Sequence, residues 1–130
     1  ILDNLKLDYI LQERTRLSET GESYLVNKNK RLITKSRFIT SIDSTIVETE
    51  SVKNAFIKGE GHGIILDYRE VYVLSYYRKL AINNRDWVII TEIDEAEAMK
   101  PIRKIKEYIF GILLIFFLFI IFITLMKLVR

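Results

Sequence analysis

The longest uniform stretch of this chain is an apolar run near its C-terminal end. Residues 108–126 carry no charged side chain, and fifteen of these nineteen residues are Ile, Leu or Phe. As an α-helix the run would be roughly 28 Å long, close to the hydrocarbon thickness of a bilayer. A domain of this size could not surround a helix that is apolar on every side. The pattern therefore predicts one transmembrane helix at residues 108–126, with a juxtamembrane helix at residues 99–107 before it and a polar segment at residues 127–130 after it.

The alternation of apolar and polar positions in residues 1–98 predicts helices and strands of one compact domain. Apolar residues within 1–11 and within 52–56 recur at helical spacing. The first two strand patterns flank a polar turn and predict a β-hairpin. The order of elements predicts an α+β fold, a PAS-like antiparallel sheet with flanking helices. The strand patterns lie at residues 23–27, 31–34, 64–68, 71–80 and 87–94.

Capping and turn residues mark the ends of the second helix. Thr49 or Ser51 is suited to cap its start, and Gly59 follows its end. Three glycines between residues 59 and 63 surround His62, the only histidine of the chain. We expect a flexible connection at these glycines.

The last strand is followed directly by a helical pattern. Asp94 and Glu97 have the spacing of a capping box, in which two side chains accept hydrogen bonds from each other's backbone N–H groups. Helical spacing then continues up to Tyr108, and Pro101 is the only interruption, where a proline would kink the helix. No run of Gly, Ser or Pro separates the strand from the helix. We therefore expect Asp94, Glu97 and Pro101 to relay a movement of the sheet to the membrane segment.

The charge and cysteine content exclude several classes of function. In residues 1–107, 18 Lys or Arg residues are interspersed with 17 Asp or Glu residues, so no basic surface for nucleic acid is indicated. The chain has no cysteine, which excludes disulfides, thiolate metal sites and cysteine nucleophiles. His62 has no nucleophile motif near it in the sequence, and no carboxylates form a recognisable acid–base pair. We expect no enzyme activity, no cofactor and no metal site.

Tyrosines are frequent in the strand patterns and allow two interpretations. Tyr24, Tyr68 and Tyr76, together with Arg37, are candidates for a small polar ligand pocket, because a guanidinium group pairs with a ligand carboxylate through two hydrogen bonds. In the alternative interpretation the rings pack in the core or across strands, and Arg37 forms a buried ion pair, for example with Asp67.

Five short motifs occur in order along the chain. They are Thr-Gly-Glu-Ser-Tyr-Leu-Val-Asn at 20–27, Ser-Arg-Phe at 36–38, Asp-Tyr-Arg at 67–69 with Val-Leu-Ser-Tyr at 73–76, Trp87 with Glu-Ile-Asp-Glu-Ala-Glu-Ala at 92–98, and Pro-Ile at 101–102. Together they resemble the membrane-proximal half of double-Cache sensor domains, which are PAS-like modules of bacterial transmembrane receptors. The chain departs from that pattern at Ser18, Lys35 and Glu70, where the family usually has Gly, Asp and Gly.

The resemblance implies that residues 1–98 are an extracytoplasmic sensor module of a chemotaxis or histidine kinase receptor in the inner (plasma) membrane of a bacterium. Residues 127–130 would then start the cytoplasmic segment that leads to an output domain. In such receptors the ligand usually binds the distal half, so the expected partners are a small-molecule ligand bound outside this chain, the lipid bilayer and a second copy in a homodimer. A cytosolic PAS-like interaction module anchored by its tail stays open as the alternative, because the charges that flank the apolar run do not decide the orientation.

Overall fold

The computed structural model describes residues 4–14, 18–39, 45–82 and 84–129. The chain divides into two compact units, Ile1–Ala98 and Met99–Arg130. The first unit contains the sheet and its helices, and the second contains one long helix.

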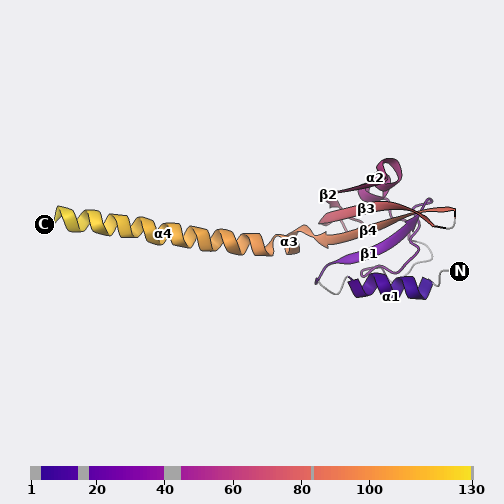
Figure 1. The fold of residues 1–130 in the computed structure, drawn as a ribbon, viewed down its shortest axis with the longest axis horizontal. Helices are drawn as coiled ribbons and strands as arrows, with labels where there is room; N and C mark the ends of the chain where they lie inside the picture. The colour runs from indigo at the N-terminus through magenta and orange to yellow at the C-terminus, as the bar shows by residue number, and fades with distance from the viewer. Residues whose placement is uncertain (1–3, 15–17, 40–44, 83, 130) are drawn as a thin grey trace. The chain divides into compact units, whose positions relative to one another are not determined.

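Four antiparallel strands form one sheet in the order β1-β4-β3-β2 (Figure 1). Strands β2, β3 and β4 follow one another as a meander, and β1 pairs with β4. The predicted α+β class with an antiparallel sheet is therefore confirmed, although the strands begin and end at somewhat different residues than expected. They are β1 (Glu22–Asn27), β2 (Glu60–Leu66), β3 (Tyr72–Ile82) and β4 (Arg85–Asp94).

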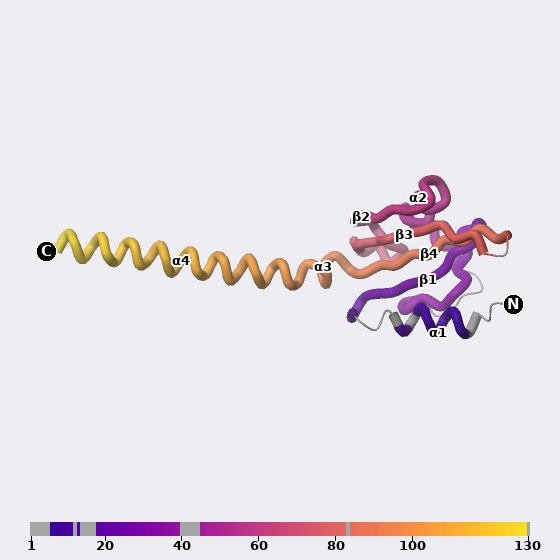
Figure 2. The backbone as a smooth tube through the Cα atoms, in the orientation of Figure 1, coloured from indigo at the N-terminus to yellow at the C-terminus, as the bar shows by residue number. Residues whose placement is uncertain are grey.

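Helix α2 (Glu50–Lys58) covers one face of the sheet, which we call the inner face. The hydroxyl of Thr49, not that of Ser51, accepts a hydrogen bond from the N–H of Val52 and caps the helix. Gly59 ends it at a positive φ of 86°, which a glycine adopts without steric cost. Helix α1 (Asn4–Arg14) packs beside β1, at the opposite edge of the sheet from β2 (Figures 1 and 2). The core lies between α2 and the inner face and includes Tyr24, Val26, Val52, Ala55, Ile65, Tyr77, Val88 and Ile90.

The predicted N-terminal hairpin is wrong in its second strand. Within residues 31–34, Arg31 and Leu32 form isolated bridges, with Ile46 and Val26, and no strand is continued, while β4 pairs with the whole length of β1. A side chain interrupts the ladder, because the Leu25 N–H donates to the hydroxyl of Thr34 at 2.9 Å and not to a backbone carbonyl. The polar side chain of Thr34 therefore replaces a backbone partner, as Ser and Thr often do.

The predicted flexible connection around His62 is also wrong. The segment belongs to β2, in which His62 pairs with Tyr76 and Gly61 pairs with Tyr77. A Cβ atom added at Gly61 would lie 2.5 Å from the Tyr77 hydroxyl oxygen. Because Gly61 has no side chain, the Tyr77 ring can lie close to its backbone. Glycines within strands often mark such close contacts.

The segment after β4 is helical over Glu95–Leu128, and only one turn residue, Met99, separates α3 (Glu95–Ala98) from α4 (Lys100–Leu128). Pro101 lies in the first turn of α4, where its missing N–H has no helical partner to lose. Pro101 therefore stands at the start of α4 without costing that helix a backbone hydrogen bond.

Helix α4 contains the apolar run, and none of its most apolar window is buried within the protein. Among the described residues it is the one helix that is long and apolar enough to cross a membrane. This fits the predicted membrane anchor.

Candidate functional site

Two glutamates face each other on the inner side of the sheet. Glu22 on β1 and Glu92 on β4 are register partners, and their exposed fractions are only 1% and 2%. Like charges in directly opposed strand positions disfavour pairing, so the surroundings of the two carboxyl groups decide how the sheet tolerates them.

The Glu22 carboxylate has three donors from segments that follow β1 and β2. Tyr68 donates its hydroxyl at 2.6 Å, and the backbone N–H of Arg37 donates at 3.1 Å. The Ser36 hydroxyl donates to the same carboxylate and also contacts the Tyr68 hydroxyl. Glu22 is thus held at the point where the residues after β1 meet the turn after β2.

The Glu92 carboxyl group is surrounded by hydroxyls. Tyr24 donates at 3.0 Å, Ser75 at 2.9 Å and Ser51 at 3.4 Å. Burial raises the pKa of Glu92 to about 7; the hydrogen bonds from Ser75 and Tyr24 oppose this effect, and the negative charges of Glu22 and Asp67 add to it. Burial is also the main cause that raises the pKa values of Tyr24 and Tyr68, so both phenols keep their protons and remain donors.

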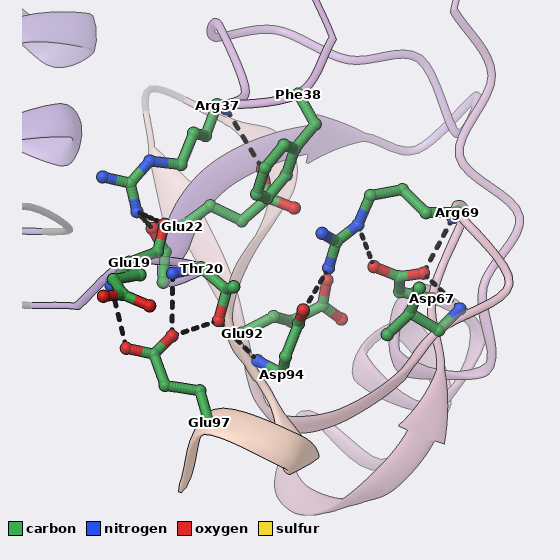
Figure 3. A network of polar contacts seen from close by, with 12 residues as sticks. Glu19, Thr20, Glu22, Arg37, Phe38, Asp67, Arg69, Glu92, Asp94 and Glu97 are labelled. Atoms are coloured by element: carbon green, nitrogen blue, oxygen red, sulfur yellow. Dashed lines mark hydrogen bonds and ion pairs between the residues drawn. The ribbon is translucent and has the colours of Figure 1, made fainter.

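Arg69 connects the turn after β2 to the end of β4. Its Nε lies 2.6 Å from Asp67 Oδ2, and its Nη2 lies 2.6 Å from Asp94 Oδ1 (Figure 3). The guanidinium also lies over the ring of Phe38, 4.1 Å from the ring centroid, a cation–π contact. The cation of Arg69 is therefore shared between two carboxylates, one on each side of it.

Glu97 of α3 contacts the residues before β1. Its carboxylate accepts hydrogen bonds from the N–H groups of Glu19 and Thr20, both at 2.8 Å, and from the Thr20 hydroxyl (Figure 3). The predicted capping box is wrong, because Asp94 binds Arg69 and its N–H donates to the Thr20 hydroxyl at 3.1 Å. We call the contacts among Glu19, Thr20, Asp94 and Glu97 the α3 clasp.

The predicted ligand residues do not form a single site. Tyr24 and Tyr68 meet edge to face, with ring centroids 5.9 Å apart. Tyr76 lies on the opposite, outer face of the sheet, where it donates to Glu60 at 2.6 Å. Arg37 Nη1 donates to the carbonyls of Ser18, Glu19 and Gly21 at 2.8 to 2.9 Å. The alternative Arg37–Asp67 ion pair is wrong, because Asp67 pairs with Arg69.

One carboxylate oxygen from each of Glu22, Asp67 and Glu92 lies within 4.8 Å of the other two. Three carboxylates at such spacing have the ligand type that hard cations take. Their oxygens already accept hydrogen bonds from hydroxyl, backbone and guanidinium donors. This donor shell fits a hydrogen-bonded carboxyl cluster, and we assign no metal ion to it.

The outer face of the sheet and α1 enclose a mostly apolar pocket of about 670 Å³. A hydrogen bond of 3.0 Å between the hydroxyls of Ser23 and Thr91 lies in its wall. The apolar side chains that line the pocket include Ile10, Leu11, Ile64, Leu74, Ile89 and Ile93.

Sequence reasoning missed the glutamate pair and its serine partners. One signal was available, since Glu92 stands at an inward position in the alternating pattern of Val88 and Ile90. The pairing of β1 with β4 brings residues 70 positions apart together, and no local pattern specifies it. Comparison with family models, curated proteins and solved structures finds no significant match for the chain.

Proposed function

We propose that the first unit is a sensor module that passes a change in its sheet to a membrane-spanning helix, as in the extracytoplasmic part of bacterial receptors. The observation that carries this proposal is the short connection between them. Strand β4 ends at Asp94, α3 begins at the next residue, and only Met99 separates α3 from α4. A stiff connection of this kind transmits small displacements that a Gly- or Ser-rich linker would absorb.

The α3 clasp supports the proposal because it fixes α3 to the sheet. Glu97 binds the residues before β1, and Asp94 binds Arg69, so a shift of β1 relative to β4 would change the contacts of α3 directly. The network also contains the residues that carry the resemblance to double-Cache sensors, among them Glu22, Asp67 and Glu92. We propose no catalytic role for these carboxyl groups, because they are buried and bonded to the protein.

The second candidate, a cytosolic interaction module anchored by its tail, stays open because basic residues flank the apolar run on both sides, with Lys127 and Arg130 after it. Four basic residues precede the apolar run, namely Lys100, Arg103, Lys104 and Lys106. Basic residues close to a transmembrane helix are more frequent on its cytoplasmic side. The orientation of the helix therefore discriminates between the two functions.

Cysteine labelling tests the orientation, because the chain has no natural cysteine. Lys28→Cys lies in the exposed turn after β1, and Val129→Cys is an exposed position beyond the apolar run. In intact spheroplasts, a membrane-impermeant thiol reagent should label Lys28→Cys and should label Val129→Cys only after lysis. The reverse pattern would establish the cytosolic alternative.

The relay itself is tested by inserting Gly-Gly between Ala98 and Met99 in the receptor that contains this chain. The insertion adds backbone freedom between the two units, so the receptor should fold and insert but its output should no longer respond to stimulus. Inserting Gly-Gly in the exposed turn between Lys28 and Asn29 is the matched control and should leave the response intact. A response that survives the first insertion would show that the signal does not pass through α3.

A further inference from the structure

The Glu22–Glu92 pair differs from an ordinary buried carboxylate pair because no cation neutralises it in the described part of the chain. The guanidinium group of Arg69 is bound to Asp67 and Asp94. The other arginine close by, Arg37, directs its Nη1 to three backbone carbonyls. Two ionised carboxylates that are 1% and 2% exposed would therefore repel each other without a counter-charge.

The hydrogen-bond donors around the two glutamates differ in kind. Glu22 accepts from the backbone N–H of Arg37, which can only donate. The described partners of Glu92 are the hydroxyls of Tyr24, Ser51 and Ser75. A hydroxyl can donate to a carboxylate or accept from a carboxylic acid, so Glu92 can be protonated without leaving its partners unsatisfied.

The other charged or titratable groups that face Glu92 do not alter this assignment. Strand β1 contributes Glu22 and Tyr24, strand β3 contributes Tyr77, the turn after β2 contributes Asp67, Tyr68 and Arg69, and β4 itself contributes Asp94. The charged residues of α2, which are Glu50, Lys53 and Lys58, are exposed. Among these groups, the carboxylates of Glu22 and Asp67 favour the neutral form of Glu92, and the hydrogen bond donated by Tyr24 opposes them.

The pair also lies next to the α3 clasp. Glu22, the first residue of β1, follows Thr20 by two positions, and Glu92 precedes Asp94 by two positions on β4. Two residues of an extended strand span about 7 Å. Thr20 and Asp94 are the residues that hold α3, so a change in β1–β4 pairing at the glutamates would reach the clasp directly.

We propose that Glu92 is a proton-binding switch: it is protonated in mildly acidic conditions, and loss of that proton at higher pH sets it against Glu22 and loosens the α3 clasp. The switch consists of the opposed pair, its reversible hydroxyl partners and the neighbouring clasp. It does not depend on the receptor function proposed above, since it concerns the first unit alone.

The test is a titration of the full chain in detergent micelles, with glutamate labelled by ¹³C at the carboxyl carbon and followed by NMR from pH 4 to pH 9. One carboxyl resonance should titrate near neutral pH, and it should be missing from Glu92→Gln. Over the same pH interval the exchange protection of the Thr20 N–H, corrected for intrinsic exchange, should fall about tenfold or more. Glu95→Gln, on α3, is the matched control and should leave both changes in place.

A second variant keeps the test decisive if Glu92→Gln fails to fold. Tyr24→Phe removes a donor that favours the carboxylate form, so the midpoint of the Glu92 resonance should move to higher pH and the loss of Thr20 protection should move with it. The proposal is overturned if Glu92 titrates in the ordinary range of a glutamate. It is equally overturned if Glu92 titrates near neutral pH while the protection of Thr20 stays constant.

Discussion

Thr20 and Glu97 are 77 positions apart, and the Glu97 carboxylate accepts hydrogen bonds from both the N–H and the hydroxyl of Thr20. The same hydroxyl accepts a hydrogen bond from the Asp94 N–H at 3.1 Å. One threonine therefore joins the residues before β1, the end of β4 and α3. The two strands and the short helix are expected to move together.

Replacing Glu97 by Ala should destabilise the first unit by about 1–3 kcal/mol, because the N–H groups of Glu19 and Thr20 lose a charged acceptor. Glu97→Gln keeps one acceptor oxygen and should cost less. Denaturant unfolding of the full chain in detergent, together with hydrogen exchange at Thr20, measures both effects. Glu95→Ala on the same short helix is the control, and an equal loss in that variant would show that the clasp has no special role.

Arg69 should not be replaceable by Lys. A lysine has a single ammonium group in place of the planar fork that reaches Asp67 and Asp94 at once. Arg69→Met leaves the buried Asp67 without its cation and should cost about 3 kcal/mol or more of unfolding free energy, with Arg69→Lys in between. Arg78→Lys is the control, because its ion pair with Glu60 is more than half exposed and such pairs contribute about 0–1 kcal/mol.

Features that depend on a single segment were predictable from the sequence. The strand pattern at residues 71–80 predicted β3, which spans Tyr72–Ile82. The spacing around α2 predicted the helix, its Gly59 end and a choice of two caps, of which Thr49 is used. In these cases the physical cause lies within a few residues of the chain.

Features that depend on distant partners were not predictable in the same way. Asp94 and Glu97 have the spacing of a capping box, but Arg69 and Thr20 compete for their side chains and backbone. The glycines around His62 suggest a loop, while the ring of Tyr77 explains Gly61 only once β2 and β3 are paired. Tertiary contacts changed the role of a correctly recognised local pattern in both cases.

Gly61 and Gly63 provide a matched pair for testing this explanation. A methyl group at Gly61 would lie 2.5 Å from the Tyr77 hydroxyl, whereas at Gly63 its nearest neighbour is a side-chain carbon of Ile65 at 3.8 Å. Gly61→Ala should therefore destabilise the first unit by about 1–3 kcal/mol through overpacking, and Gly63→Ala should be close to neutral or slightly stabilising. Thermal unfolding of the two variants decides the matter. Equal melting temperatures would mean that Gly61 is not needed for the Tyr77 ring.

Because α4 is the expected membrane anchor, membrane association should weaken stepwise as charged residues are introduced into it. A charged residue near the middle of a transmembrane helix costs about 2.5–3.5 kcal/mol of insertion free energy. Leu118→Arg should therefore weaken membrane association, and Ile115→Arg combined with Leu118→Arg should largely abolish it in a fractionation experiment. Leu118→Ala is the control and should stay in the membrane. If the double variant also remains with the membranes, another segment anchors the protein.

The Glu92 carboxyl group predicts how the stability of the first unit depends on pH. Its pKa of about 7 lies above its ordinary value of 4.5, so the folded state binds the proton more tightly than the unfolded state. The resulting stabilisation is fully present below about pH 4.5 and is lost as the pH rises through about 7. Since each tenfold difference in proton affinity corresponds to about 1.4 kcal/mol, the stability of the wild-type unit should decrease by about 3 kcal/mol over this pH interval.

The variant Glu92→Gln is neutral at every pH and should show a flatter profile of stability against pH. Urea unfolding at pH 5 and pH 8 should therefore separate the two proteins. A wild-type unit that is more stable at pH 8 than at pH 5 would contradict a neutral buried Glu92.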